Sequence, residues 1–206
     1  MITVIGLTGQ SGSGKSFFSS RFLEKGIPVI DADQVSHWVT SSDPNCLNAI
    51  REAFGTSAFE EDGSLSRKKL GTIVFSDPKK LKLLNKTVFP YITREIRRQI
   101  NECENREEKL VLLDAPTLYE AGADRFCSYV VAVCAPFELR LQRIMKRDGL
   151  SREAALLRLS AQNDDAFYIS RADMVLYNDT TKEAFLQKTD DLYETLIRRF
   201  VLSKMK

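Results

Sequence analysis

Ligands for a tightly bound metal ion and partners for disulfide bridges are scarce in this sequence. It has one histidine, His37, and four cysteines that form no C-x-x-C pair and no other metal-ligand spacing. A zinc site, which needs several such ligands close together, is therefore not expected. Cys127 and Cys134 lie in or beside an apolar run, a position typical of small buried side chains in a reducing compartment.

Long hydrophobic runs and an excess of one charge are also missing. No apolar run approaches the ~20 residues that a membrane-spanning helix requires. The chain opens directly on a strand pattern, so we expect no signal peptide, no membrane partner and a cytoplasmic location. The 30 lysines and arginines nearly balance the 28 aspartates and glutamates, which gives no reason to expect nucleic acid as a partner. The length of 206 residues fits one domain, and a monomer is the default expectation.

The sequence does contain a glycine-rich loop near its start. Residues 9–16 read GQSGSGKS, which has the G-x-x-x-x-G-K-S spacing of a phosphate-binding P-loop. An apolar run, residues 2–7, comes before it, and a segment with a helical pattern, residues 17–25, follows. This strand, loop and helix order is the context in which the motif binds phosphate, so the sequence predicts binding of a nucleoside triphosphate.

Each position of the loop has a chemical reason. The glycines let the backbone pass close to phosphate oxygens, and their N–H groups at a helix N-terminus form a positively polarised nest. Lys15 adds a charge for the β- and γ-phosphates, and Ser16 offers a hydroxyl to Mg²⁺. We therefore expect ATP contacts from Gly9, Ser11, Gly12, Ser13, Gly14, Lys15 and Ser16.

The rest of the chain alternates strand and helix patterns, which predicts an α/β fold of the P-loop NTPase class with a doubly wound parallel sheet of five strands. The strands are expected at residues 2–7, 27–30, 110–114, 129–133 and 172–177. Residues 41–105 show helical spacing without a buried strand and predict a helical insertion, in which Pro90 should start or kink a helix. The expected nucleotide-binding core covers about 1–40, 106–140 and 170–206, and a final amphipathic helix covers 181–205.

Two aspartates follow the second predicted strand, in the sequence Asp31-Ala32-Asp33. The carboxyl ends of strands border the ligand crevice of open α/β sheets. Asp33 can therefore be a general base for a substrate hydroxyl, or an N-cap of the next helix. Both roles can hold at once, one for each aspartate. His37, on the same predicted helix, is a candidate substrate contact or a packed side chain.

Asp114 ends the third predicted strand, where a Walker-B-like carboxylate would hold the Mg²⁺ shell; the alternative is a strand-end cap. In the loop after it, Pro116 and Glu120 are candidate substrate contacts.

The helix after the fourth strand carries Arg140, Arg143 and Arg147, whose spacing places them on one face. Such cations suit a transferring phosphoryl group, although a solvated basic face is the alternative. A tight turn joins this helix to a second helix that bears Arg158. We expect the two helices, at about 140–165, to form a lid over the nucleotide, with Arg140 contacting ATP.

Two classes of protein compete, a small-molecule kinase and an NTPase switch. The guanine-reading motif Asn/Thr-Lys-x-Asp of GTPases is missing; the nearest match, residues 85–88, lacks the Asp. A nucleic-acid motor would usually be longer and more basic. The pair of basic helices fits a kinase lid instead.

The motifs together resemble those of the dephospho-coenzyme A kinases, over nearly the whole chain. The most discriminating is the D-A-D at 31–33, which nucleoside monophosphate kinases generally lack there. The matches are IGLTG at 5–9, GSGKS at 12–16, VIDAD at 29–33, DGSLSR at 62–67, VF at 74–75, DAP at 114–116, LYE at 118–120, QR at 142–143, RD at 147–148, Arg158, Gln162, AD at 172–173 and Asn178.

The resemblance implies phosphorylation of the ribose 3′-hydroxyl of dephospho-CoA by ATP, the last step of coenzyme A synthesis. It also implies a nucleotide-binding core, a helical substrate domain and a lid. The catalytic residues would be Asp33, Lys15, Arg143 and Arg147, with Mg²⁺ held by Ser16 and Asp114. Asp33, His37, Asp114, Pro116 and Glu120 would contact the acceptor.

The chain departs from the family pattern at several positions. Gln10-Ser11 stands where Gly-Ile is usual, Phe89 replaces a histidine, Thr117 replaces a leucine, and Tyr177 precedes Asn178 in place of Asn or Asp. These departures leave another small-molecule or nucleoside monophosphate kinase as the alternative, and an NTPase switch behind it.

Overall fold

The computed structural model describes residues 1–75 and 77–202. Within them the chain divides into two compact units. One contains Met1–Ile30 and Ile100–Lys206, and the other contains Asp31–Gln99. Each unit has its own buried apolar side chains.

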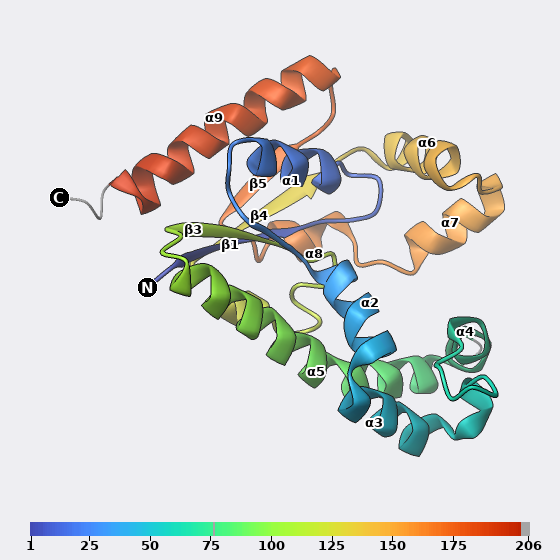
Figure 1. Ribbon diagram of the computed structural model, residues 1–206. Coiled ribbons are helices and arrows are strands. Elements are labelled where there is room, and N and C mark those ends of the chain that lie inside the picture. Colours follow the sequence, from blue (N-terminus) through green and yellow to red (C-terminus); the bar gives the residue numbers. More distant parts are fainter. Residues whose placement is uncertain (76, 203–206) are drawn as a thin grey trace. The chain divides into compact units, whose positions relative to one another are not determined.

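A five-stranded parallel sheet is the centre of the first unit (Figure 1). The strand order is β2-β3-β1-β4-β5, so the strand that leads into the P-loop lies in the middle. β1 pairs with β3 and β4, and β4 pairs with β5, all in parallel. The strands are β1 Thr3–Thr8, β2 Val29–Asp31, β3 Leu110–Asp114, β4 Tyr129–Cys134 and β5 Met174–Tyr177. The predicted α/β fold and its five strands are confirmed.

The strands β1 and β4 are buried along their whole length, because both faces of the sheet are covered. On one face, Ile5, Leu7, Val131 and Val133 pack with side chains of α1 (Lys15–Glu24) and α9 (Lys182–Phe200), which include Phe18, Phe22, Phe185, Leu192 and Leu196. Figure 1 shows α1 and α9 on this side and α8 (Asp165–Ile169) on the other. On that other face, a Cβ on Gly6 would lie 2.7 Å from the Cys127 sulfur.

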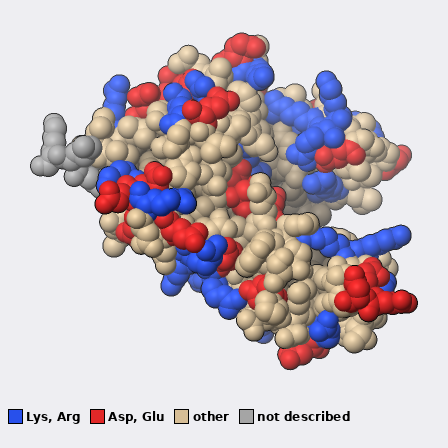
Figure 2. Space-filling view, in the orientation of Figure 1, with Lys and Arg blue, Asp and Glu red and all other residues tan. Residues whose placement is uncertain are grey.

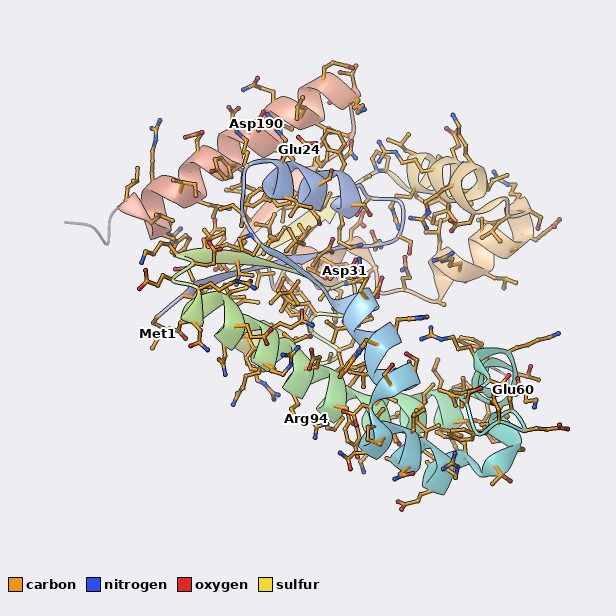
Figure 3. All side chains as sticks on the ribbon, in the orientation of Figure 1. Met1, Glu24, Asp31, Glu60, Arg94 and Asp190 are labelled. Atoms are coloured by element: carbon orange, nitrogen blue, oxygen red, sulfur yellow. The ribbon has the colours of Figure 1, made fainter. Side chains whose placement is uncertain are left out.

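An ion pair fastens α9 to α1. Arg21 donates from Nε and Nη2 to the two carboxylate oxygens of Asp190, at 2.8 and 3.0 Å, and from Nη1 to Glu24. Figure 3 shows Asp190 on α9 and Glu24 on α1. The Arg21 guanidinium holds the pKa of the Asp190 carboxyl below its usual range. The helix was predicted over 181–205; it begins at Lys182, capped by the Thr181 hydroxyl, and ends at Phe200. The last part of this predicted helix, residues 203–205, lies outside the described residues.

Two more helices of this unit, α6 (Phe137–Asp148) and α7 (Arg152–Ser160), form an antiparallel pair with a small core of its own. Leu141 and Ile144 of α6 pack against Ala155 and Leu159 of α7. Gly149 adopts a left-handed conformation after α6, and the Ser151 hydroxyl caps α7, which confirms the predicted turn. Figure 2 shows Lys and Arg side chains gathered over this pair.

The second unit is helical in its described part, as the sequence predicted for this stretch. Its elements are α2 Ala32–Ser42, α3 Pro44–Phe54, the 3₁₀ turn η1 Thr56–Ala58, α4 Arg67–Phe75 and the part of α5 (Pro78–Asn105) up to Gln99. Asp43 caps α3 and forms an ion pair of 2.6 Å with Arg94 of α5.

Pro90 does not start a helix, which was one of the two alternatives expected from the sequence; that it kinks the helix stays a prediction. It lies inside α5, which runs unbroken on both sides of it. The apolar residues around it, Val88, Ile92 and Ile96, are buried at helical spacing. Their burial stabilises the helix enough to outweigh the backbone hydrogen bond that proline cannot make.

The four cysteines are free thiols. Burial raises the pKa of Cys127 to about 12 and the pKa of Cys134 and of Cys46 to about 11. A thiol with such a pKa carries almost no thiolate at neutral pH and is a poor nucleophile. This confirms the prediction that Cys127 and Cys134 are small packing side chains.

Candidate active site

The P-loop joins β1 to α1 at the centre of the sheet, and three of its glycines have left-handed φ values. They are Gly9, Gly12 and Gly14, at 133°, 78° and 114°. A Cβ would lie 2.2 Å from the Val133 carbonyl oxygen at Gly9, and 2.3 Å from the Asn178 side-chain nitrogen at Gly14. At Gly12 it would lie 2.8 Å from the backbone oxygen of Arg140. The glycines are therefore required by neighbouring parts of the protein itself, in addition to any phosphate.

We predict that Gly14→Ala lowers kcat/KM for ATP by about 100-fold or more, because the new Cβ displaces Asn178 and the loop peptides that it holds. Gly26→Ala is the matched control. Gly26 also has a positive φ, 82°, but nothing lies within 4 Å of its Cβ position. It should cost only about 1 kcal/mol of stability and keep its activity. Equal kinetic losses in both variants would show that backbone strain, and not the contact with Asn178, sets the effect.

Side chains of Arg143 and Asn178 hold the carbonyl side of the loop. Arg143 Nη1 donates to the Gly12 oxygen at 3.1 Å and to the Ser13 oxygen at 3.4 Å, and Asn178 Nδ2 donates to the same Ser13 oxygen at 2.8 Å. Arg143 Nη2 also donates to Asn178 Oδ1 at 3.1 Å. In a trans peptide the N–H points opposite to the C=O. The Gly14 N–H therefore points away from Arg143 and Asn178.

Lys15 and Ser16 form the first turn of α1, directly after the loop. Lys15 Nζ donates to the Gly9 carbonyl at 2.8 Å, which places the ammonium group across the loop from its own backbone. Ser16 is exposed. At this position the positive end of the helix dipole and the charge of Lys15 both attract an anion.

Asp114 ends β3 and lies in register with Leu7 of β1. The buried hydroxyl of Ser19 lies within hydrogen-bond distance of both the Asp114 carboxylate and the Lys15 carbonyl, and its single proton is shared between the two acceptors. One turn of α1 therefore links Asp114 to the residue that carries the P-loop cation. Sequence reasoning missed Ser19; its place three residues after Ser16, on the same helix, was the available signal.

The three arginines that share a face of α6 have three different sets of partners. Arg143 binds the loop carbonyls, and burial lowers the pKa of its guanidinium from the ordinary value. Arg140 is buried, donates from Nε to the Ala135 carbonyl at 2.9 Å and lies 3.8 Å from Asp165. Arg147 pairs with Asp148, which also accepts from Arg158 of α7. Arg143 and Arg147 thus have carbonyl or carboxylate partners, whereas Nη1 of the buried Arg140 has no hydrogen-bond partner among the described residues. That these cations neutralise a transferring phosphoryl group stays a prediction.

The loop after β3 carries Pro116 and Glu120. The Pro116 carbonyl accepts from the Thr8 hydroxyl at 3.3 Å, which ties this loop to the end of β1. Glu120 is exposed and accepts from Asn163 Nδ2 at 2.7 Å. Both residues therefore belong to the same unit as the P-loop.

The second unit carries Asp33 and His37 on α2. Asp31, labelled in Figure 3, lies at the end of β2 and caps the helix. Its Oδ1 accepts from the N–H groups of Asp33 and Gln34. Asp33 lies in the first turn with an exposed side chain, at the helix end that stabilises negative charge. Of the two roles weighed for this pair of aspartates, the N-cap belongs to Asp31, and the general-base role of Asp33 stays a prediction. His37 is exposed, and its carbonyl accepts from Arg67 Nη2 at 3.2 Å.

Within residues 1–75 and 77–202, no group of three or more His, Cys, Asp or Glu side chains could hold a metal ion. No helix in this part of the chain is long and apolar enough to cross a membrane.

The parallel sheet, the glycine loop with Lys15 and Ser16, and the α6–α7 pair define the class of protein as a P-loop kinase. The family model for dephospho-CoA kinase matches residues 3–184. The chain belongs to the dephospho-CoA kinase family.

Relatives of this family are similar to this chain over almost its full length. A dephospho-CoA kinase of Lactobacillus johnsonii is 36% identical over 198 residues, which are 96% of this chain and 100% of that protein. The structure of dephospho-CoA kinase from Campylobacter jejuni has a TM-score of 0.71 and 28% identity, and covers 95% of this chain and 98% of its own. A Thermus thermophilus structure has a TM-score of 0.80 and 32% identity, with 94% and 97% covered. The predicted family is confirmed.

Proposed function

We propose that this chain transfers the γ-phosphoryl group of ATP to the ribose 3′-hydroxyl of dephospho-CoA, the final step of coenzyme A synthesis. The observation that carries this proposal is the match of the dephospho-CoA kinase family to residues 3–184, which include the P-loop and the D-A-D segment at 31–33. Of the P-loop kinases and NTPase switches weighed from the sequence, this family alone accounts for both motifs.

The residues of the loop bind ATP in this proposal. The N–H groups of Gly12, Gly14 and Ser16 face the phosphates, and Lys15 supplies the cation for the β- and γ-phosphates. The Ser13 N–H donates to the Gln10 carbonyl within the loop at 3.2 Å. The loop is supported on its carbonyl side by Arg143 and Asn178, so it does not have to reorganise when the nucleotide binds. Arg140 and Arg147, on the α6–α7 pair that we propose as the lid, complete the cationic lining.

Asp33 is the proposed general base. It follows the carboxyl end of β2 by two residues, and Asp31 supplies the helix cap, so the Asp33 carboxylate is not required for the cap. It accepts the proton of the 3′-hydroxyl as the oxygen attacks phosphorus. His37, Asp114, Pro116 and Glu120 are the proposed acceptor contacts. We propose that the helical stretch at about 41–105 is the substrate-binding insertion.

Ser16 and Asp114 would hold Mg²⁺. Mg²⁺ in nucleotide sites keeps several waters and phosphate oxygens and takes one or two protein ligands, so a hydroxyl and a carboxylate are a fitting set. When bound, the ion would neutralise charge on the phosphate oxygens. Ser19 orients the Asp114 carboxylate through its hydroxyl.

We also propose that the protein acts as a monomer in the cytoplasm, where its four free thiols stay reduced.

The test is a single incubation of the protein with Mg-ATP and dephospho-CoA, followed by chromatography. CoA and ADP should form in equal amounts. Adenosine, AMP and shikimate in place of dephospho-CoA are the controls and should give no phosphorylated product. Release of ADP without a phosphorylated acceptor would instead identify an NTPase, and phosphorylation of a control would identify a kinase with another acceptor.

A further inference from the structure

The segment between α7 and α8 contacts the P-loop directly. Gln162 Oε1 accepts from the Ser11 N–H at 3.0 Å, and Gln162 Nε2 donates to the Ser11 hydroxyl at 2.9 Å. Both ends of one amide group thus bind one residue of the loop, across 151 positions of sequence. A planar amide that makes two hydrogen bonds to one residue fixes orientation as well as distance.

The residues beside Ser11 and Gln162 make a second connection between the two segments. Gln10 Nε2 donates to the Asn163 carbonyl at 2.8 Å, and Asn163 Nδ2 donates to Glu120. The Gln10 side chain is buried, with 4% of its surface exposed, and its Oε1 has no hydrogen-bond partner among the described residues. Loss of the bond to Asn163 would leave the rest of this amide buried and unpaired as well. Such a buried amide costs more free energy than a surface one, so the contact is held firmly.

On the P-loop side, the two residues that make these bonds, Gln10 and Ser11, are positions at which the chain departs from the family pattern. A glycine at position 10 has no side chain to reach Asn163, and an isoleucine at position 11 has no hydroxyl for Gln162. Only the bond from the N–H of residue 11 would remain. Two of the three bonds therefore depend on the Gln10-Ser11 pair of this sequence.

Helix α6, at the other end of the α6–α7 pair, also contacts the P-loop. Gly12 packs against the backbone of Arg140, and Arg143 donates to the Gly12 and Ser13 carbonyls. Because α6 and α7 share a core, they form one packed body. The start of this body, through α6, and the segment that follows it, through Gln162, hold neighbouring residues of the P-loop between them.

We infer that Gln162 is a positioning residue that, with Ser11 and Gln10, couples the α6–α7 pair to the P-loop and so sets the affinity for ATP. The inference rests on the proposed phosphoryl transfer from ATP. Gln162 acts through the Ser11 peptide: it fixes the first bend of the loop, and the N–H groups of Gly12 and Gly14 are left for the phosphates. The Ser11 N–H serves as the anchor of the α6–α7 pair and not as a phosphate donor.

A double-mutant cycle tests the coupling. Gln162→Ala should raise KM for ATP about 10-fold and Ser11→Ala about 3-fold, with kcat changed less than about 2-fold, since one or two hydrogen bonds of positioning are lost. The double variant should be no worse than Gln162→Ala alone, because Ser11 and Gln162 make one contact. Ser11→Thr, which keeps the hydroxyl, should restore most of the affinity. Gln187→Ala, which removes an exposed amide of α9 bonded to Asp191, is the control and should match wild type.

Hydrogen exchange of the full chain gives a readout that does not depend on the acceptor. Peptides that cover residues 8–16 and 158–168 should exchange about 10-fold faster in Gln162→Ala than in wild type, and those of β4 should not change. A lower melting temperature with unchanged KM for ATP and unchanged exchange at 8–16 would overturn the inference, as would additive effects in the double variant. If dephospho-CoA is not phosphorylated, the proposed function fails, but ATP titration and exchange still decide the role of Gln162.

Discussion

Asp33→Asn is expected to lower kcat by about 100-fold or more and to leave the dissociation constant for ATP within about 2-fold of wild type. The amide cannot accept the proton of the 3′-hydroxyl, whereas the side chain keeps its shape and its place in the first turn of α2. ATP contacts the loop of the other unit in our proposal, so its affinity should not depend on this charge. Steady-state kinetics with dephospho-CoA, together with a fluorescence titration of ATP, measure both quantities.

Asp31→Asn is the matched control, because it removes a carboxylate two residues away. Asn caps a helix as well as Asp does, so the Asp33 and Gln34 N–H groups keep their acceptor. Its kcat should stay within about 3-fold of wild type. If Asp33→Asn turns over at the wild-type rate, Asp33 is not the base. If both variants lose activity equally, the negative charge of the segment matters more than proton transfer.

The fold could be predicted from the sequence because its signals are local and agree with one another. Apolar runs such as residues 110–113 and 129–133 are buried on both faces of a parallel sheet, which requires continuous hydrophobicity. The strand that precedes the glycine loop and the helix that follows it were predicted from one motif. That Pro90 does not start a helix could not be read from the sequence because it depends on tertiary packing: the buried stripe of α5 stabilises the helix on both sides of it.

The parts of the site that the sequence did not reveal are contacts across long separations. Ser19 and Asp114 are 95 positions apart, and Asn178 reaches Ser13 across 165. Residue spacing placed Arg140, Arg143 and Arg147 on one face of a helix, but it could not show which partner each one meets. Phosphate binding explains from the sequence why the P-loop needs glycines. The close approach of Val133, Arg140 and Asn178 is a second reason, and it is visible only in three dimensions.

These contacts explain how a glycine-rich loop can be a fixed phosphate site. Each glycine raises the conformational freedom of the unfolded chain, and a loop with several of them has little intrinsic order. Here Asn178, Arg143 and Gln162 hold the loop from outside, through bonds to its carbonyls and to Ser11, and Val133 of β4 packs against Gly9. The free energy of ordering is therefore supplied on folding, and the nucleotide does not have to supply it on binding.

Lys15→Ala tests the loop at its most charged position and should have the other large effect. We expect kcat/KM for ATP to fall by on the order of 100-fold or more, with a weaker ATP affinity as well as a lower kcat, because the ammonium group interacts with the phosphates both in the bound state and in the transition state. The variant also loses the bond from Nζ to the Gly9 carbonyl, so its melting temperature has to be measured alongside.

Lys25→Ala, at the opposite end of the same helix, is the matched control for Lys15→Ala. Lys25 lies at the C-cap of α1, 3.3 Å from Asp190, and its loss should cost less than about 1 kcal/mol of stability without a change in kcat/KM. An ATP titration of Lys15→Ala that superimposes on that of wild type would refute the assignment of the loop as the phosphate site, whatever the effect on turnover.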